Sequence, residues 1–156
     1  MNKIKNPWID TPNYHCFGCA PGNEKGLRME FYSDGGDVVC EWNPHAAFEG
    51  EGGILHGGVQ AALIDEIANW YIQVYCGTVG ATVSLNIRYL HPVSITKGAI
   101  TLRAGLKKKR KNIITVRVEL KSSAGTLCTT ADADFFTVSP ELAGTDYGYP
   151  GADAYT

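Results

Sequence analysis

The strongest hydrophobic pattern in the chain predicts one long helix, from Gly57 to about Cys76. Apolar residues recur at spacings of three and four, which is the period of an α-helix. One apolar arc holds Val59, Leu63, Ile67, Trp70 and Val74, and a second holds Ile64, Ala68, Tyr71, Ile72 and Tyr75. The narrow polar face holds Asp65, Glu66, Asn69 and Gln73. A helix that is apolar around most of its circumference must be enclosed by other elements.

Alternation of apolar and polar residues predicts strands on both sides of this helix. Leu27, Met29 and Phe31 share one side of a first strand, a hairpin turn spans residues 33–37, and the strand returns over 38–42. Four extended runs follow the helix, over residues 81–91, 98–106, 112–121 and 125–138. In the first run, Val83, Leu85, Ile87 and Tyr89 alternate with Thr82, Ser84, Asn86 and Arg88. This alternation predicts a sheet with one packed face and one polar face.

Together these elements predict an α+β protein in which a strongly curved antiparallel sheet wraps a single central helix. We assign the packed domain to residues 27–138. An N-terminal extension, residues 1–26, is rich in Pro, Gly and Asn and contains a C-x-x-C turn. Residues 139–156 contain turn formers and tyrosines without a period, which predicts a tail that is ordered only if something docks it.

Length and charge narrow the class of protein. A chain of 156 residues can form one core and is too short for two ordinary domains. The net charge of −2 and one basic run, residues 107–111, give nucleic acid only a local foothold, so we expect no nucleic-acid partner. No apolar run is typical of a signal peptide or a membrane span, so we expect a cytoplasmic protein without a membrane partner.

The five cysteines fit a reducing compartment better than a disulfide framework, because their number is odd and their positions are scattered. Only Cys16 and Cys19 form a C-x-x-C, and His15 beside them makes a zinc or redox site conceivable. No second cysteine pair or histidine pair follows, and one pair cannot fill the four positions of a tetrahedral zinc ion. We therefore expect a turn without a metal.

The start of the helix has the composition of an anion-binding site. A helix N-terminus presents unpaired N–H groups, and Gly57 and Gly58 leave those groups open to a ligand oxygen. Together with His56, they predict an oxyanion hole. Asp65 lies eight residues past Gly57, about 12 Å along the helix, which is too far for both to hold one carbonyl. We therefore expect the site to form between two subunits of a symmetric homodimer.

Three stretches carry a resemblance to a known family. HGGVQAALIDE is preceded by CFGCAPGN-x-x-GL and followed by TVSLNIRYLHPV. Over residues 16–138 the chain resembles the hotdog-fold acyl-CoA thioesterases of the PaaI-like group. The resemblance implies a long central helix wrapped by an antiparallel sheet, dimers whose sheets join edge to edge and often pair into tetramers, and cleavage of acyl-CoA to acid and free CoA without a cofactor.

The resemblance also implies roles for individual residues. Asp65 falls on the catalytic carboxylate of the family, and Gly57 and Gly58 fall on the donors that polarise the thioester carbonyl. Thr82 falls where relatives keep a Ser or Thr near the attacking water, and His56 falls on the histidine that shapes the turn. Whether the carboxylate attacks directly or activates water stays open.

Two positions complicate this transfer. Some other hotdog thioesterases use a glutamate, so Glu66 is an alternative to Asp65; consecutive helical residues point about 100° apart, so only one can face the site. Several relatives carry an asparagine about six residues before the histidine, where this chain has Gly50, with Glu49 beside it. The groups that position the water are therefore in question.

Coenzyme A carries phosphates, which call for cations on the protein surface. Lys108, Lys109 and Arg110 belong to a basic run expected at a turn between two strands, and Arg88 is expected to share a face with Thr82. These four residues are candidates for a phosphate clamp. The alternative is a solvated hairpin whose charges keep a sheet edge soluble.

Two other function classes remain open at this stage. A non-catalytic acyl-CoA binder or regulator would keep the fold without the carboxylate, and the presence of Asp65 argues against it. A hydratase or dehydratase would need a histidine and an acid poised on one acyl chain. The position of His56 before two glycines at a helix start matches the thioesterase pattern better.

Overall fold

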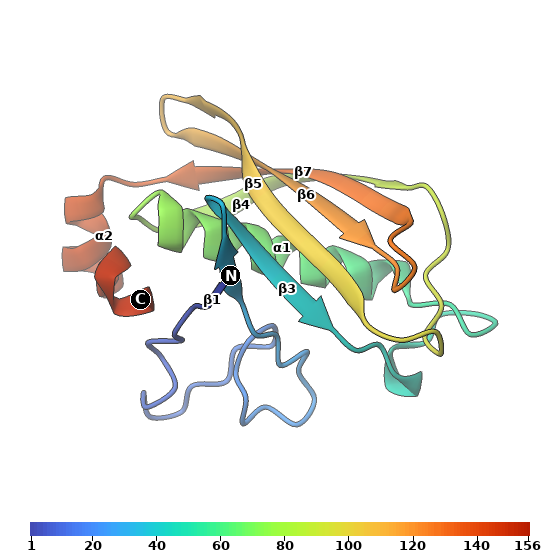
Figure 1. Ribbon diagram of the computed structural model, residues 1–156. Coiled ribbons are helices and arrows are strands. Elements are labelled where there is room, and N and C mark those ends of the chain that lie inside the picture. Colours follow the sequence, from blue (N-terminus) through green and yellow to red (C-terminus); the bar gives the residue numbers. More distant parts are fainter.

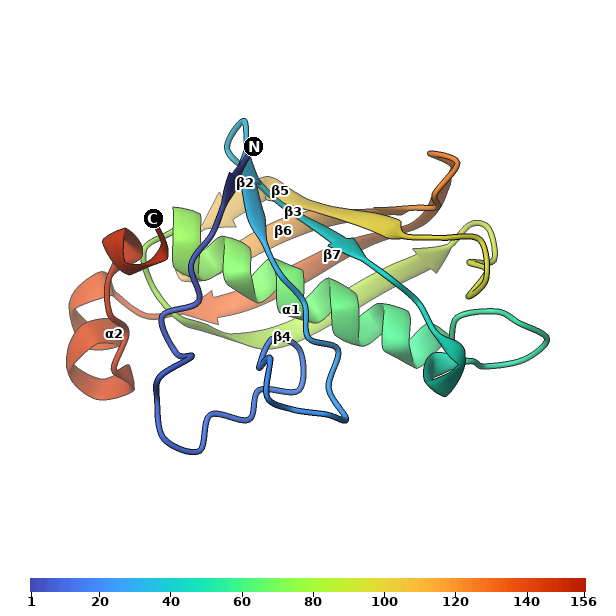
Figure 2. The ribbon, with the colours of Figure 1, turned by 60° about the horizontal axis from the view of Figure 1, so that its bottom comes forward.

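The long helix is present as predicted in the computed structural model, which describes residues 1–156. Helix α1 spans Gly57–Tyr75 and runs through the centre of the molecule (Figures 1 and 2). His56 caps its N-terminus, and Gly77, with φ +64°, lies just beyond its end in a conformation that suits glycine. Its buried residues are Gln60, Leu63, Ile64, Ile67, Ala68, Trp70, Tyr71 and Ile72.

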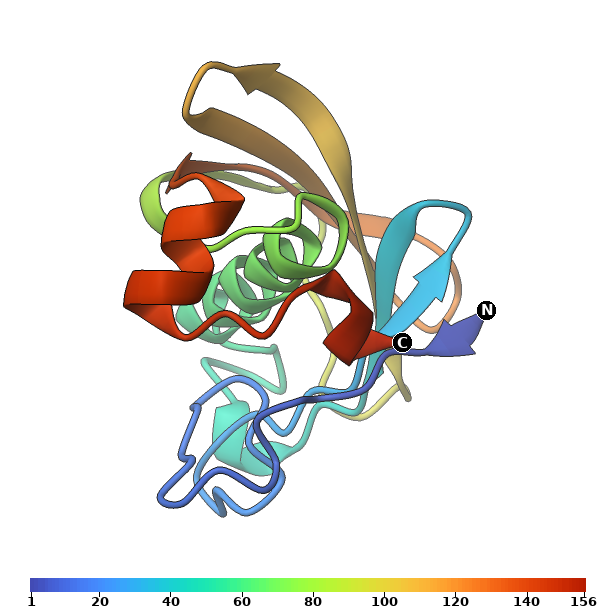
Figure 3. The ribbon, with the colours of Figure 1, turned by 90° about the vertical axis from the view of Figure 1, so that its left-hand side faces the viewer.

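One antiparallel sheet covers one side of α1, which confirms the predicted α+β architecture. Its strand order is β1-β2-β3-β5-β6-β7-β4, and Figure 3 shows the sheet curving around the helix. Strand β4, which follows the helix in the chain, forms the far edge and pairs only with β7. The strands are β1 (Asn2–Lys3), β2 (Tyr32–Asp34), β3 (Asp37–Trp42), β4 (Gly80–Tyr89), β5 (Ile100–Arg110), β6 (Ile113–Lys121) and β7 (Leu127–Thr137). Every strand pair is antiparallel.

For the first predicted strand, the buried side chains are as predicted, but the extended backbone is not. Leu27, Met29 and Phe31 are buried as expected, yet the strand begins only at Tyr32. Arg28 has φ +52°, a left-handed conformation that interrupts an extended strand. The N–H groups of Leu27 and Met29 are donated to carbonyls of the N-terminal loop instead of a neighbouring strand.

The N-terminal segment covers the side of α1 that the sheet leaves open (Figures 1 and 3). Phe31 stacks on Trp70 of α1 with ring centroids 4.4 Å apart. This packing explains how a helix that is apolar on most sides is enclosed: the sheet buries one side, and the extension with its loop buries the other.

The C-terminal segment is ordered, because it docks on the chain's own central helix. It forms α2 (Pro140–Tyr147) and a short 3-10 helix η2 (Ala152–Tyr155); another 3-10 helix, η1 (Ala46–Phe48), precedes α1. The hydroxyls of Tyr149 and Tyr155 donate to the backbone and side-chain carbonyls of Gln73. The predicted condition for order is therefore met within one chain. None of the helices has the length and apolar character needed to cross a membrane.

Candidate active site

A β-bulge in β4 decides which side chains of this strand face the helix. Thr82 pairs with Phe135 and Ser84 pairs with Asp134, so Val83 is an extra residue without a partner on β7. Phe135 is buried against the core. Thr82 therefore faces α1 together with Leu85, Ile87 and Tyr89, whereas Val83 is 55% exposed. The expectation that Thr82 lies on the polar face with Ser84, Asn86 and Arg88 is wrong, because the bulge shifts the alternation by one residue.

The bulge brings Thr82 to Asp65. The Thr82 hydroxyl donates a hydrogen bond of 2.7 Å to Oδ1 of Asp65 on α1. The Asp65 carboxylate is half-buried and has no ion-pair partner within the chain. A carboxylate that is held by one hydroxyl and free of cations keeps lone pairs available for a water proton or an electrophilic carbon.

At the start of α1, one of the two expected amide donors has an acceptor within the chain and the other has none. Nδ1 of His56 accepts the Gly58 N–H at 2.9 Å, as a side-chain helix cap. The Gly57 N–H has no acceptor within the chain. Only the Gly57 amide is thus free to bind a ligand oxygen. Through its bond to Gly58, the His56 side chain fixes the shape of the turn.

Sequence reasoning missed the contact that fixes the Gly57 peptide. The Tyr89 hydroxyl, from the end of β4, donates to the Gly57 carbonyl at 2.8 Å. A buried pair supports the next turn, because Thr129 donates to Gln60 Oε1 at 2.6 Å while Gln60 Nε2 donates to the Leu55 carbonyl at 3.3 Å. The tyrosine carried no separate signal, since its apolar ring also fits the alternation of a packed strand face.

The loop before α1 accounts for the glycine at position 50. The Gly50 N–H is donated to the Ile54 carbonyl, and Glu49 accepts the Gly53 N–H at 2.6 Å. A Cβ atom at Gly50 would lie 3.2 Å from Cα of His56. A side chain there would require the backbone at His56 to give way by a few tenths of an ångström.

Gly57 and Asp65 stay apart within one chain. They are separated by eight residues of continuous helix, about 12 Å at 1.5 Å per residue. An open cleft of about 310 Å³ lies beside the helix start, and Leu55, Gly57, Tyr89 and Leu90 are among its lining residues. Asp65 does not line this cleft.

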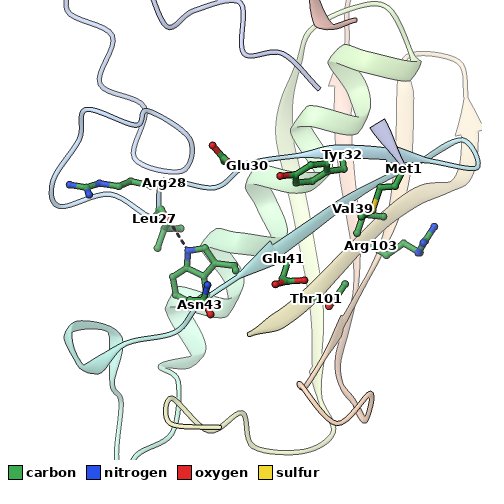
Figure 4. A pocket seen from close by; sticks show the side chains of 11 residues that line it. Met1, Leu27, Arg28, Glu30, Tyr32, Val39, Glu41, Asn43, Thr101 and Arg103 are labelled. Atoms are coloured by element: carbon green, nitrogen blue, oxygen red, sulfur yellow. Dashed lines mark hydrogen bonds between the residues drawn. The ribbon is translucent and has the colours of Figure 1, made fainter. Parts of the chain in front are cut away.

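A larger cavity of about 770 Å³ lies elsewhere, against β3 and β5 (Figure 4). Tyr32, Val39, Glu41 and Arg103 line it together with Trp42, whose indole N–H is donated to the Leu27 carbonyl at 2.7 Å. None of the residues that the sequence singled out for chemistry lines this cavity.

Glu66 points to the other side of α1 from Asp65. Its Oε1 accepts the indole N–H of Trp70 at 3.0 Å and lies 3.4 Å from the Cys16 sulfur. Cys16, Cys19 and Glu66 therefore form one cluster, whose potential ligand atoms all lie within 4.8 Å of one another. The structure thus brings the two neighbouring carboxylates into different surroundings, as the angular step between them predicted.

The basic residues do not converge on Asp65 within the chain. Strand β5 continues to Arg110, so the turn of the β5–β6 hairpin is at residues 111–112. Lys107 pairs with Asp132 at 2.6 Å, whereas Lys108, Lys109 and Arg110 are exposed and have no ion-pair partner. Arg88 is opposite Thr130, on the outer face and away from Thr82.

The polar outer face of the sheet has its own carboxylate. Asp134 accepts hydrogen bonds from Ser84 at 2.8 Å and from Thr115. These two hydroxyls hold the pKa of Asp134 below its usual range, mainly because they stabilise the ionised form. This network lies on the opposite side of β4 from the Thr82–Asp65 pair.

The arrangement of a long helix within a curved antiparallel sheet is the hotdog fold, and the chain belongs to the thioesterase superfamily. The sequence profile of that superfamily matches residues 52–129, half of the chain. Acyl-coenzyme A thioesterase 13 of Homo sapiens is 30% identical over 92 residues, covering 57% of this chain and 64% of that protein. The chain thus spans less than two thirds of the length of this relative.

Solved structures agree with this assignment. Zebra fish thioesterase superfamily member 2 is 30% identical, with a TM-score of 0.65 over 75% of this chain and 88% of that protein. A Streptococcus mutans protein solved with acetyl CoA is 18% identical, with a TM-score of 0.64 over 71% of this chain and 89% of that one, and it supports the fold alone.

Proposed function

We propose that the protein is an acyl-CoA thioesterase that hydrolyses an acyl- or aryl-CoA thioester to the free acid and CoA. The observation that carries this proposal is the Thr82–Asp65 hydrogen bond, because it holds an otherwise unpaired carboxylate on the inner side of β4. Acyl-coenzyme A thioesterase activity is named for the human relative, and the family is the thioesterase superfamily.

In the proposed reaction, the Gly57 N–H binds the carbonyl oxygen of the thioester. Negative charge develops on that oxygen in the transition state, and a free amide at a helix N-terminus stabilises it. Asp65 either removes a proton from the attacking water or attacks the carbonyl carbon itself. Thr82 holds the carboxylate in position, and His56 keeps the glycine turn in shape through its bond to Gly58.

The proposed site combines Gly57 of one subunit with Asp65 of another. Within one chain these groups are about 12 Å apart along α1. Strand β4 forms a sheet edge, and two of its large side chains are exposed in the single chain, Val83 at 55% and Tyr89 at 52%. Pairing along this edge would bury both side chains, remove an open strand edge and form two sites by symmetry. We expect a homodimer, and two such dimers would form the tetramer that the family resemblance implies.

We assign CoA binding to the β5–β6 hairpin. Lys108, Lys109 and Arg110 have no carboxylate partner, so their charges are available to the phosphates of CoA. The hairpin projects beyond the rest of the sheet (Figure 1), where a neighbouring subunit can approach it. Arg88 lies on the outer face of β4, so its share in CoA binding would require a ligand that reaches that face.

The decisive experiment removes the proposed oxyanion donor without removing the fold. Proline lacks an N–H and is well tolerated at the first position of a helix. His56 has φ −56° and ψ 132°, a conformation that a residue before proline readily adopts. We expect Gly57→Pro to lower kcat about a hundred- to a thousandfold in a thiol-release assay with a panel of acyl-CoAs. Gly57→Ala keeps the N–H and is the matched control.

Mixing two inactive variants tests where the site forms. A dimer of one Gly57→Pro chain and one Asp65→Asn chain has one intact site if each site uses both chains. Random mixing then restores about a quarter of the parent activity. No recovery in verified mixed dimers would refute the site between subunits, and full activity of Gly57→Pro would refute the oxyanion role. Enoyl-CoA hydration without thiol release would instead indicate a hydratase.

A further inference from the structure

The C-x-x-C of the N-terminal extension meets a carboxylate that lies far from it in the sequence. The Cys16 and Cys19 sulfurs are 2.9 Å apart, and the Cys16 sulfur lies 3.4 Å from Oε1 of Glu66, fifty residues away. All five cysteines of the chain are free thiols. The sequence offered the two cysteines with His15 beside them; in the structure the third member of the cluster is Glu66, and His15 is not part of it.

The loop is shaped to receive this carboxylate. A Cβ atom at Gly18, between the two cysteines, would lie 2.3 Å from Cδ and 2.4 Å from Oε2 of Glu66. No side chain fits at this position while Glu66 stays where it is. By contrast, a Cβ atom at Gly22, in the same loop, would meet nothing within 4 Å. The absence of a side chain at Gly18 therefore serves the approach of Glu66 to the cysteines.

Neighbouring groups hold all three side chains. The Cys19 N–H is donated to the Cys16 sulfur at 3.3 Å, an interaction that favours a negatively charged sulfur. Tyr14 lies 2.9 Å from the Cys19 sulfur, and Trp70 donates to Glu66 at 3.0 Å. Such outer contacts orient the ligands of metal sites. No lysine, arginine or histidine pairs with Glu66, so the cluster has no cation of its own.

The distance between the sulfurs fits neither a disulfide nor a metal site without a small movement. Tetrahedral zinc with Zn–S bonds of about 2.3 Å needs sulfurs about 3.8 Å apart, whereas a disulfide needs about 2.05 Å. Each is about 0.9 Å from the observed 2.9 Å. Glu66 favours the metal site over the disulfide. Its carboxylate repels the thiolate that begins disulfide exchange, whereas for a cation it provides a further ligand and negative charge.

We propose that Cys16, Cys19 and Glu66 bind one thiophilic divalent cation of the zinc class. The two sulfurs bind as thiolates, so their protons are released to solvent, and one carboxylate oxygen is the third ligand. Cys16 and Glu66 are only half-buried, so water can reach the fourth position. The ion clips the N-terminal extension to α1 on the side opposite Asp65, and its binding energy adds to the stability of that contact.

Metal content and spectroscopy test this proposal. The full-length protein, purified under reducing conditions, should contain or take up about one equivalent of Zn²⁺. Co²⁺ in its place should give an intense near-ultraviolet band from thiolate-to-metal charge transfer. Cys16→Ser and Cys19→Ser should abolish this band, and Glu66→Gln should weaken binding about tenfold or more. Cys76→Ser and Cys128→Ser are matched controls, since both cysteines lie outside the cluster.

A second pair of variants separates metal binding from loss of folding. Gly18→Ala pushes Glu66 away while leaving every ligand in place, and should weaken metal binding, whereas Gly22→Ala should not. Chelation should lower the Tm of the parent protein and leave that of Cys16→Ser unchanged. The proposal is overturned if folded, reduced protein takes up no Zn²⁺ at micromolar concentration, or if the cysteine and glutamate variants bind as tightly as the parent. A reversible Cys16–Cys19 disulfide without metal uptake would identify a redox pair instead.

Discussion

Two neighbouring carboxylates, Asp65 and Glu66, have different surroundings on the two sides of α1. On the sheet side, Asp65 accepts a hydrogen bond from Thr82, whose position is fixed by the hydrogen-bonded ladder between β4 and β7. On the other side, Glu66 meets Trp70 of its own helix and the thiols of an irregular loop. A step of one residue along the helix, about 100°, is enough to give two acids different chemical partners.

This difference separates a proposed catalytic role from a proposed structural one. The sheet side holds its carboxylate with a hydroxyl, which leaves the acid free to react. The extension side places its carboxylate beside soft sulfur atoms, which are ligands for a metal ion. The two sites can therefore be tested one without the other.

The largest expected effect is a reciprocal loss of function in two isosteric variants. Asp65→Asn should lower thioester hydrolysis about a hundred- to ten-thousandfold, because it removes the proposed base or nucleophile. Its Zn²⁺ content should equal that of the parent. Glu66→Gln should show the opposite pattern, with weakened metal binding and hydrolysis within about threefold of the parent. Thiol release and metal analysis on the same preparations measure both. Equal loss of hydrolysis in the two variants would contradict the division between the sides.

A smaller effect is expected from the hydroxyl that holds Asp65. Thr82→Ala removes a hydrogen bond to a charged group, a contribution of about 1.5–3 kcal/mol, so kcat should fall about tenfold or more. Thr82→Ser keeps the hydroxyl and should recover most of the activity. If alanine and serine variants have the same kcat, the hydroxyl does not position the carboxylate.

The smallest effect is expected at the basic hairpin. Lys108→Gln and Arg110→Gln should each raise KM for acyl-CoA about two- to fivefold with little change in kcat, since an exposed ion pair contributes at most about 1 kcal/mol. The increase should shrink at high salt, where such pairs are screened. Lys25→Gln, an exposed cation in the N-terminal extension, is the charge-matched control. An equal rise in KM with Lys25→Gln would indicate a general charge effect.

Periodicity predicted the elements that repeat, and it failed where one residue breaks the repeat. The helix over residues 57–75 and the strands after it follow from their apolar spacing. The bulge at Val83 and the left-handed Arg28 have no such signal, so the predicted facing of Thr82 and the predicted start of the strand before the first hairpin turn were wrong. A single displaced residue changes every side chain beyond it.

The candidate site was predictable only in its local parts. The glycine turn with His56 as a cap can be recognised from adjacent residues. The position of Asp65 on the polar face of the helix follows from the apolar spacing around it. The cluster of Cys16, Cys19 and Glu66 depends on a contact across fifty residues, which no local pattern contains. The docking of the tail likewise depends on Gln73, a polar residue that the helix pattern alone leaves facing solvent.

The extra residue in β4 also determines that Thr82 and Tyr89 point to the same face of the strand. Thr82 and Tyr89 are separated by an odd number of positions, so a regular strand would point them in opposite directions. Both nevertheless reach α1, one at Asp65 and the other at the Gly57 carbonyl. Both contacts therefore depend on the bulge, because a regular pairing of the same residues with β7 would turn one of the two side chains to the outer face of the sheet.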